Sequence, residues 1–297
     1  MPYHDGMLLR ARAHQIAAYD FASQSKWQGP YFFVQAADPQ FGMFDKDERW
    51  DRETVLFERT VAEVNRLRPR FLVISGDQVN AMPGGPQYHA QNEEFFRIVG
   101  MVDPSIPVIC LPGNHDTGDS PDLSALKSYR EYFGDDWYEF WLGGVCYLVI
   151  DTCLYHDPSR AAAEQDAQHA WLAATLTAAR AKNPRHIVLL QHHPWFLDAP
   201  DDGDQYFTIP RVRREPALAL LRDAQVAAVF AGHYHRNAGG WDGDLEMVTT
   251  SAVGMPLGED PSGFRVVEVY EDRIQHRYFG LDDVPTRILL DPMRETA

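Results

Sequence analysis

Five short segments carry side chains that bind metal ions in proteins, and each segment directly follows an apolar run. The first three are Asp38-Pro39-Gln40 after YFFVQAA, Gly76-Asp77 after FLVIS and Gly113-Asn114-His115-Asp116 after VICLP. The other two are Gln191-His192-His193-Pro194 after HIVLL and Gly232-His233-Tyr234-His235 after VAAVFA. Such apolar runs are typical of buried strands, and the carboxyl ends of strands in an open α/β sheet meet at one edge. The sequence therefore predicts that these polar side chains converge on a metal site.

Each segment also has an ordinary structural explanation when it is taken alone. A Gly-Asp pair after a strand is a common turn, the Asn114 segment can form an Asx turn that caps a helix, and the His192 segment can be a strand-end loop. Alternation in an extended segment places His233 and His235 on the same side. The repetition of metal-capable residues after several strands favours a metal site over a series of unrelated turns.

The chemical types of these side chains limit the metal and the reaction. Imidazole, carboxylate and amide groups without a thiolate favour Mn²⁺, Fe, Zn²⁺ or Mg²⁺. The set exceeds what one ion needs, so two ions that share a carboxylate are the simplest arrangement. Two ions about 3.5–4 Å apart clamp the attacking and leaving oxygens of a phosphoryl displacement and lower the pKa of a water between them. The sequence contains no Walker-type loop and no Gly-x-Ser-x-Gly elbow, so metal-activated water is the expected nucleophile.

The elements that must position these residues alternate between strands and helices, as in an α/β domain. Expected strands are 31–37, 71–75, 108–111, 138–142, 145–151, 186–191, 226–231, 246–251, 264–270 and 274–279. Expected helices are 53–68, 92–101, 123–133, 165–182 and 215–224. The apolar positions of the first helix are Val55, Leu56, Thr60, Val64 and Leu67. This many strands without a Gly/Ser-rich linker predict two packed sheets with flanking helices in a single domain.

The composition excludes several classes of protein. The 27 Lys and Arg residues against 43 Asp and Glu give a net charge of −16, which is unsuited to general binding of nucleic acid or an anionic membrane face. Three cysteines are too few for a disulfide framework and fit a reducing compartment. No apolar stretch approaches the ~20 residues of a membrane span, and Met1–Gln15 lacks the apolar core of a secretory signal. We expect a cytoplasmic protein that binds neither nucleic acid nor membrane.

Taken together, the motifs D-x-Q, GD, GNHD, H-x-P and GHxH resemble those of the calcineurin-like metallophosphoesterase superfamily. The segments VQAADPQFG, QHHPWF and AGHYHRNAGG look like one branch, the calcineurin-like phosphoesterase domain-containing family of serine/threonine phosphatase-like proteins. The resemblance runs from about Tyr31 to Asp283 within a single expected domain over 1–297. It implies a four-layer αββα sandwich, in which two mixed sheets are flanked by helices and a bimetal centre lies at one sheet edge.

The resemblance also implies a metal-binding role for seven motif residues. Asp77 is the implied bridging carboxylate. One metal site would be completed by Asp38, Gln40 and His235, and the other by Asn114, His192 and His233. In the H-x-P segment we choose His192 over His193, because the ligand lies two residues before the proline.

Other motif residues are implied to act on the substrate. His115 would stabilise phosphate charge or protonate the leaving oxygen, and Asp116 would orient His115 by a hydrogen bond. Asn114 and His115 would also contact the substrate. Arg236 and Asn237, which follow His235, either reach the phosphate or brace their loop. The rim aromatics Tyr88, Trp195, Phe196 and Tyr206 either form an apolar shelf beside the metals or pack the long loops.

Two positions depart from the patterns of related families. Gln40 stands where histidine is usual in the superfamily, and an amide oxygen is a weaker ligand than imidazole, so we expect a looser first site. Asn80 stands where purple acid phosphatases have a tyrosine three residues after the bridging aspartate. A Fe(III)–tyrosinate site is therefore not expected, and Asn80 is predicted to line the pocket or cap a turn.

The predicted function is hydrolysis of phosphomonoesters by a hydroxide that bridges two divalent metal ions. The resemblance implies phosphoserine and phosphothreonine as substrates, with a phosphoprotein as the partner. One alternative is a phosphodiesterase that cleaves cyclic nucleotides or glycerophosphodiesters with the same metals. The other is a metal-stabilised scaffold that has lost turnover through Gln40.

Overall fold

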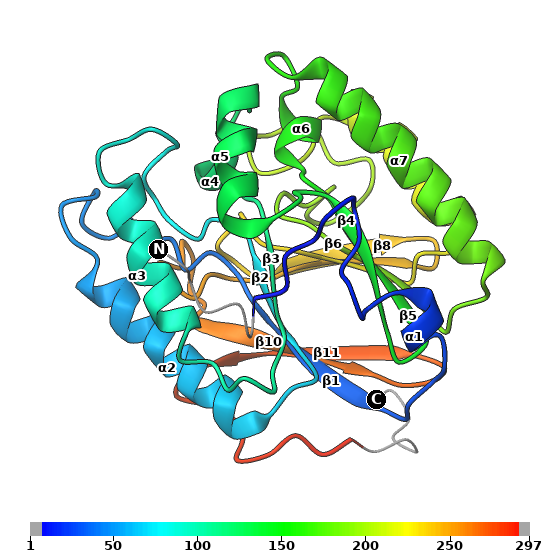
Figure 1. The fold of residues 1–297 in the computed structure, drawn as a ribbon, viewed down its shortest axis with the longest axis horizontal. Coiled ribbons are helices and arrows are strands. Elements are labelled where there is room, and N and C mark those ends of the chain that lie inside the picture. The colour runs from blue at the N-terminus through cyan, green and yellow to red at the C-terminus, as the bar shows by residue number, and fades with distance from the viewer. Residues whose placement is uncertain (1–7, 291–297) are drawn as a thin grey trace.

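Two mixed β-sheets pack face to face between outer layers of helices, in a computed structural model that describes residues 8–290 (Figure 1). The first sheet has the strand order β11-β10-β1-β2-β3, in which β1, β2 and β3 are parallel and β10 and β11 are antiparallel. Its strands are β1 (Tyr31–Ala36), β2 (Leu72–Ser75), β3 (Val108–Leu111), β10 (Gly263–Val269) and β11 (Ile274–Gly280). The four-layer αββα sandwich predicted from the motifs is confirmed.

The second sheet has the order β4-β5-β6-β7-β9-β8. β5, β6, β7 and β9 are parallel, and β4 and β8 pair antiparallel at its two edges. Its strands are β4 (Tyr138–Leu142), β5 (Val145–Val149), β6 (Ile187–Leu190), β7 (Ala228–Ala231), β8 (Ala238–Asp242) and β9 (Leu245–Thr249). The edge strand β8 was not predicted, because AGGWD lacks the β-branched residues that mark a strand.

The longer helices cover the outer faces of the two sheets (Figure 1). The first sheet packs against α2 (Asp51–Leu67), α3 (Tyr88–Val99) and α5 (Leu123–Phe133), and the second against α7 (Ala162–Ala181) and α8 (Arg211–Asp223). Single turns form α1 (Phe21–Gln24), α4 (Asn114–Thr117) and α6 (Cys153–His156). None of the helices in the described part of the chain combines the length and apolarity that a bilayer crossing requires.

One residue was assigned to the wrong face of the first helix. Val55 is 55% exposed, whereas Phe57, Val61 and Val64 are buried against the first sheet. The error arises because apolar residues occur on more than one side of this helix, and only contact with the sheet selects the buried side. The three cysteines, Cys110, Cys146 and Cys153, are buried and free, as their small number predicted.

Side chains that alternate along the strands build the core between the sheets. In β1, Phe33 points toward the second sheet, while its neighbours Phe32 and Val34 face the helices. The Phe33 ring stacks on Phe71 at 4.6 Å and meets Tyr147 and Phe230 of the second sheet edge-on at 5.9 and 5.7 Å. This shared interior supports the prediction of one domain.

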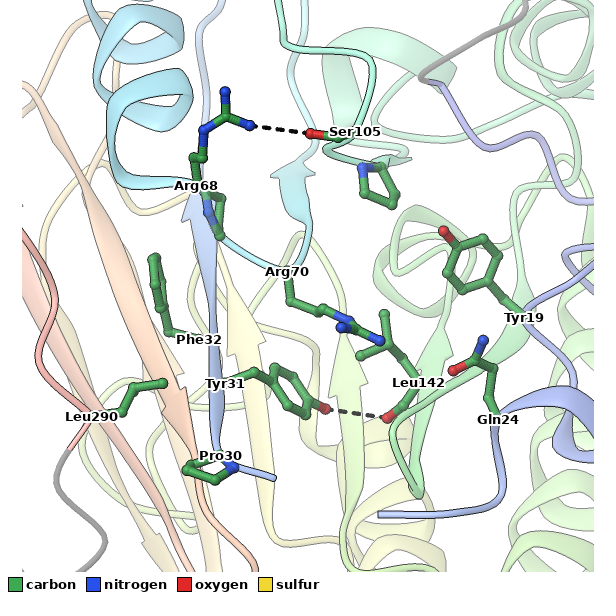
Figure 2. A pocket seen from close by; sticks show the side chains of 12 residues that line it. Tyr19, Gln24, Pro30, Tyr31, Phe32, Arg68, Arg70, Ser105, Leu142 and Leu290 are labelled. Carbon is green, nitrogen blue, oxygen red and sulfur yellow. Dashed lines mark hydrogen bonds between the residues drawn. The ribbon is translucent and has the colours of Figure 1, made fainter. Parts of the chain in front are cut away.

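A cleft of about 430 Å³ lies at the amino ends of β1, β2 and β3 (Figure 2). Arg70 extends across it beside Tyr31, whose hydroxyl donates a 3.3 Å hydrogen bond to the carbonyl of Leu142. The polar motif residues follow the carboxyl ends of the same strands. The cleft is therefore at the edge of the sheet opposite to the predicted metal site.

Phe33→Ala tests the aromatic contact between the sheets. We expect a loss of about 3–5 kcal/mol in the free energy of unfolding, because the truncation leaves a cavity among rings from both sheets. Val55→Ala is the matched control and should change that free energy by less than about 0.5 kcal/mol. Chemical denaturation measures both, and equal losses would contradict this description of the core.

Candidate metal centre

The polar motif residues meet at one edge of the sandwich, as the positions of the strand ends require. Asp38, Asp77 and Asn114 follow the carboxyl ends of β1, β2 and β3 in the first sheet. His192 and His233 follow β6 and β7 in the second sheet. The side chains therefore come from both sheets, and all five residues are buried.

The backbone adopts an unusual conformation at most of these positions. Five of the predicted ligands have left-handed φ angles: Asp38 (50°), Gln40 (42°), Asp77 (48°), His233 (67°) and His235 (53°). Residues other than glycine rarely adopt this region, which costs of order 1–3 kcal/mol each. The rest of the fold holds these residues in place at that cost, and such strain is concentrated at functional sites in proteins.

Two of the motif glycines are required by close approach. A Cβ atom on Gly113 would collide with the carboxylate and backbone nitrogen of Asp77. A Cβ atom on Gly232 would lie 2.6 Å from Oδ2 of Asp38. The glycines thus let neighbouring loops pack directly against the two carboxylates.

Asp38, Asp77 and His235 form one cluster of potential ligands. Each offers one ligand atom, and these atoms lie within 4.8 Å of one another. Nε2 of His235 is 3.4 Å from Oδ1 of Asp38, while Nδ1 of His235 binds the carbonyl oxygen of Met255 at 2.7 Å. Since a carbonyl accepts hydrogen bonds, Nδ1 carries a proton, and Nε2 is the ring atom that faces the carboxylates.

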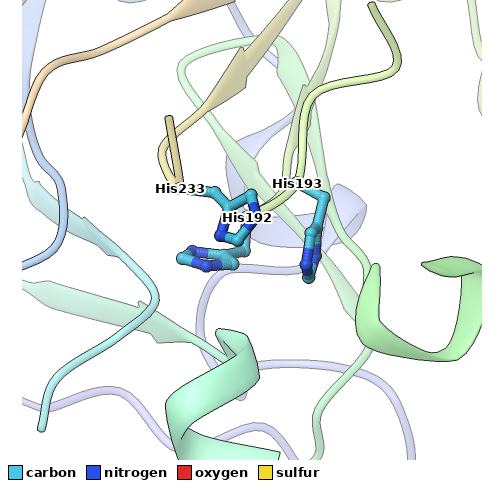
Figure 3. A group of neighbouring side chains, drawn as sticks. All are labelled: His192, His193 and His233. Carbon is cyan, nitrogen blue, oxygen red and sulfur yellow. The ribbon is translucent and has the colours of Figure 1, made fainter. Parts of the chain in front are cut away.

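His192, His193 and His233 form the second cluster, between the segments that follow β6 and β7 (Figure 3). Nδ1 of His192 binds the carbonyl oxygen of Ser75 at 2.8 Å. Its Nε2 donates a 3.0 Å hydrogen bond to Oδ1 of Asn114 and lies 3.4 Å from Oδ1 of Asp77. Asp77 thus borders both clusters, which is the place that a bridging carboxylate requires.

The two histidines of the His-His-Pro segment differ in their surroundings. His192 faces Asn114 and Asp77, whereas Nδ1 of His193 lies 3.1 Å from the Thr152 hydroxyl and its ring stacks on His156 at 4.8 Å. Both Nε2 of His193 and Nε2 of His233 are buried without a hydrogen-bond partner. The contacts with Asn114 and Asp77 favour His192 as the ligand, and His193 lies beside it in the same cluster, with the two ring centroids 5.0 Å apart.

The side-chain amide oxygen of Gln40 is buried and lacks a protein partner. Its Nε2 donates a 3.2 Å hydrogen bond to Oδ1 of Asn80, and Nδ2 of Asn80 donates to Asp47 at 2.9 Å. These bonds fix the amide, and Oε1 of Gln40 is buried with no hydrogen-bond partner. The backbone N–H of Gln40 donates to the carbonyl oxygen of Asp77 at 2.9 Å. A buried oxygen left unpaired on a residue tied to Asp77 suits a cation, so the residues fit the metal that the motifs imply.

The charges inside the site suit a cation as well. Burial alone would raise the pKa of Asp77, but the adjacent His192 outweighs it and holds this pKa well below its usual range. Burial opposes the charge of His192, yet Asp77 raises the pKa of His192 to about 10. Burial and the neighbouring imidazoles push the pKa values of His193 and His233 well below the usual range. The site therefore holds an ionised carboxylate beside two neutral imidazoles and a protonated His192, whose Nε2 proton a divalent ion would displace.

The predicted hydrogen bond from Asp116 to His115 is wrong. Oδ2 of Asp116 accepts from the backbone N–H of Gly113 at 2.8 Å, and Oδ1 accepts from that of Gln78 at 3.1 Å. Nδ1 of His115 instead donates to the carbonyl oxygen of Asn80 at 2.5 Å. Asp116 is sequestered by the turn that it closes, so it supports the loops around Asp77 and does not orient His115.

Arg236 and Asn237, which were predicted to reach the substrate or to brace their loop, each bond to other parts of the protein. Arg236 donates to the carbonyl oxygen of Leu257 at 2.8 Å and lies over the ring of Tyr234. The side-chain oxygen of Asn237 accepts a 2.6 Å hydrogen bond from Arg265. Both contacts brace the loop, which is the second of the two roles considered for this pair.

Among the rim aromatics, only Tyr206 reaches the clusters. Tyr88, Trp195 and Phe196 are buried in packing clusters. Tyr206 is 54% exposed, with its ring 5.3 Å from that of His233. Its hydroxyl lies within hydrogen-bonding reach of Asn114 and Asp119, and burial followed by the charge of Asp119 raises its pKa to about 12.

Several residues at the site were not predicted from the sequence. Phe207 lies 5.7 Å from the His233 ring, and Oδ1 of Asp119 accepts a 2.9 Å hydrogen bond from Nδ2 of Asn114. Asn80 was expected at the pocket, but its double contact with Gln40 and His115 was not. The position of Asp119, two residues past the GNHD-Thr turn, is the only sequence signal that marks it.

The sequence matches a known family over most of its length. Residues 29–237, more than half of the chain, match the family model described as calcineurin-like phosphoesterase. The chain is 38% identical over 302 residues to the human serine/threonine-protein phosphatase CPPED1, covering 98% of this chain and 96% of that protein. The protein of the same name from Danio rerio is 39% identical over 298 residues, with 97% and 96% covered.

Solved structures share the architecture at low sequence identity. A dimetal phosphatase from Danio rerio has a TM-score of 0.62 and 18% identity, covering 86% of this chain and 97% of that chain. The purple acid phosphatase PPD1 from yellow lupin has a TM-score of 0.64 and 14% identity, covering 88% of this chain and 53% of that chain. At these identities the likeness concerns the fold.

Asp77→Asn tests whether one carboxylate serves both clusters. We expect Mn²⁺ affinity to fall at both sites, by more than the roughly 10–100-fold typical of residues that only support ligands. His115→Gln should leave both affinities unchanged, because His115 contributes only its backbone N–H to Asp77. Calorimetric titration measures both variants. Loss confined to one site in Asp77→Asn would contradict the bridging position.

A pair of substitutions tests the hydrogen bonds that link Gln40 to Asn80 and Asn80 to Asp47. Gln40→His should tighten the Asp38 cluster for Mn²⁺ about tenfold, because imidazole is the stronger ligand. Asn80→Ala should weaken it by roughly tenfold, because the Gln40 amide is no longer held. Asp201→Asn is the control, because Asp201 is exposed in the acidic loop formed by residues 198–204, and it should leave binding unchanged. An unaltered affinity in Gln40→His would show that Gln40 does not face the metal.

Proposed function

This chain belongs to the calcineurin-like phosphoesterase family, and from that membership we propose that it dephosphorylates serine and threonine side chains with two bound metal ions. Metal-dependent hydrolysis of phosphoric esters is the activity of the family. The choice of phosphoserine and phosphothreonine rests on relatives named serine/threonine-protein phosphatase, to which the chain is similar over almost its full length. The proposal includes a cytoplasmic setting, which the free cysteines support.

The orientation of two histidines is the observation that carries this proposal. His192 and His235 both donate Nδ1–H to a backbone carbonyl, from Ser75 and Met255 respectively. In both residues Nε2 is therefore the ring atom that faces a buried carboxylate. A buried carboxylate and a ring nitrogen in this position need a cation between them, which is a proton in the metal-free protein and would be a metal ion in the loaded one.

The residues of the two clusters would each hold one ion. Asp38, Gln40, Asp77 and His235 would bind the first, and Asp77, Asn114, His192 and His233 the second. When bound, such a pair of ions lowers the pKa of water and neutralises the charge that develops on a phosphoryl group. Manganese, iron, zinc and magnesium all suit this set of oxygen and nitrogen donors.

His115 is placed to act on the leaving group. Its backbone N–H donates to Oδ1 of Asp77 at 2.9 Å, which ties the residue to the centre of the site. Its Nδ1–H is committed to the carbonyl of Asn80, so Nε2 is the ring atom that can carry a proton to the leaving oxygen. A serine or threonine alkoxide is a poor leaving group, and protonation is the help that it needs most.

The chain's own residues also shield the reaction from bulk solvent. Asp38, Asp77, Asn114 and His192 are almost fully buried, so the phosphoryl group is the part of a substrate that must enter. Tyr206 covers the His233 side of the opening with a phenol that stays protonated at neutral pH. A low-dielectric site of this kind strengthens each electrostatic contact made to the phosphate.

Two esters and one variant test this function. The Mn²⁺-loaded protein should hydrolyse p-nitrophenyl phosphate faster than bis-p-nitrophenyl phosphate. His115→Ala should lower kcat roughly 10²–10⁴-fold on a phosphoserine peptide while retaining metal, because an alkoxide needs the proton. The loss should be smaller on p-nitrophenyl phosphate, whose leaving group needs little protonation.

Other outcomes would revise the proposal in distinct ways. A much faster diester rate would indicate a phosphodiesterase. A metal-loaded protein that is inert toward both esters and toward phosphoserine would indicate a scaffold. Equal losses on the two leaving groups would remove His115 from proton transfer.

A further inference from the structure

A polar groove of about 560 Å³ lies beside the candidate metal centre. One wall is the turn at 82–84, and the other comprises residues from 117–128 together with Arg160. None of the predicted metal ligands lines this groove.

Both walls continue directly from the segments that hold His115. The turn at 82–84 follows Asn80, whose carbonyl oxygen accepts the Nδ1–H of His115. The other wall begins at Thr117, the last residue of α4, which also carries Asn114 and His115. Oδ1 of Asp119 lines the groove and accepts from Nδ2 of Asn114 at 2.9 Å. A substrate whose phosphoryl group lies at the metal centre would therefore have this groove next to it.

The chemistry of the lining suits a hydrophilic chain. Hydroxyl groups of Ser120, Ser124 and Ser128 line it, with only Met82 as a large apolar side chain. No aromatic ring lines it, so the groove has no platform for stacking a nucleobase. An extended polypeptide, whose N–H and C=O groups need hydrogen-bond partners, matches these walls.

The charge of the groove is negative. The guanidinium of Arg160 is paired with Asp122, so it offers little attraction to a further phosphate. The exposed carboxylate of Asp119 is the remaining charge in the lining. This balance disfavours a polyphosphorylated ligand and favours a cationic side chain near the phosphorylated residue.

We propose that this groove is the subsite for the polypeptide that flanks a phosphorylated serine or threonine, and that Asp119 selects a basic residue in that flank. The inference rests on the proposed function. It adds where the substrate chain lies and which sequence the enzyme prefers. A small aryl phosphate has no flanking polypeptide to occupy the groove, so its hydrolysis reports on the metal centre.

The first experiment compares phosphoserine peptides that differ only in whether arginine or glutamate occupies the flanking positions. We expect kcat/KM to favour arginine by up to about fivefold, the effect of an exposed ion pair, and added salt to reduce the preference. Hydrolysis of p-nitrophenyl phosphate by the same preparation establishes that the metal centre is active. No preference, or a preference for glutamate, would overturn the role of Asp119.

The second experiment fills the groove. Ser124 is exposed in the first turn of α5 and lines the groove, so Ser124→Trp should raise KM for the arginine peptide roughly tenfold and leave kcat nearly unchanged. Lys127→Trp is the matched control, because Lys127 is exposed on the same helix but does not line the groove. Both variants should hydrolyse p-nitrophenyl phosphate at the rate of the unmodified protein.

The outcomes separate this inference from the proposed function. If Ser124→Trp leaves KM for the peptide unchanged, or if Lys127→Trp raises it equally, the groove is not the subsite. If the unmodified protein hydrolyses p-nitrophenyl phosphate but no phosphopeptide, the polypeptide inference fails while the phosphoesterase activity stands. If it hydrolyses neither when loaded with Mn²⁺, the proposed function itself fails.

Discussion

Two buried carboxylates facing each other are the constraint on which the rest of this structure depends. Asp38 and Asp77 have ligand atoms within 4.8 Å of one another, away from water. At an effective dielectric constant of about 20, two unit charges roughly 4 Å apart repel by about 4 kcal/mol, and desolvation adds to this cost. Such a pair persists only where cations or hydrogen bonds balance it. His192, His235 and the metals that they would bind supply that balance. The free energy that the fold spends on burying these carboxylates is therefore itself a sign of function.

The fold accommodates this pair by means that would be unfavourable elsewhere. Left-handed backbone at Asp38 and Asp77 turns both side chains into the same space, and glycines at 113 and 232 let neighbouring loops close over them. Gln35 ties the two sheets together next to the site, since its Nε2 donates to Ser75 of the first sheet and to the carbonyl of Ala231 of the second. This cross-link lies at the carboxyl ends of β1, β2 and β7, where a change in sheet spacing would separate the two clusters. Packing and function are thus joined at one edge of the sandwich.

The sequence was sufficient to predict the positions of residues that directly follow strands. It was insufficient to predict the contacts that loops make with one another. Polar residues directly after apolar runs predicted the convergence of Asp38 and His233, because strand ends in an α/β sandwich have few other places to lie. Val55 was misjudged because burial is decided by the neighbouring element, and β8 was missed because AGGWD lacks β-branched residues. The hydrogen bonds of Asp116 were misjudged for a related reason: its partner Gln78 lies 38 positions earlier, and adjacency to His115 in sequence suggested a closer but incorrect partner. No local pattern indicates which of two nearby carbonyls or carboxylates a histidine will meet.

Asn80 shows how the departures from the family pattern depend on one another. Its side-chain oxygen accepts from the Gln40 amide, and its backbone oxygen accepts from the His115 ring. A weak amide ligand would need its oxygen held toward the metal, and the bonds from Gln40 to Asn80 and from Asn80 to Asp47 fix the orientation of that amide. A tyrosine at this position would have only its phenol oxygen, at the far end of the ring, as a side-chain acceptor. Glutamine at 40 and asparagine at 80 are therefore best understood as one paired change, and through the carbonyl of Asn80 that pair is connected to the residue proposed to protonate the leaving group.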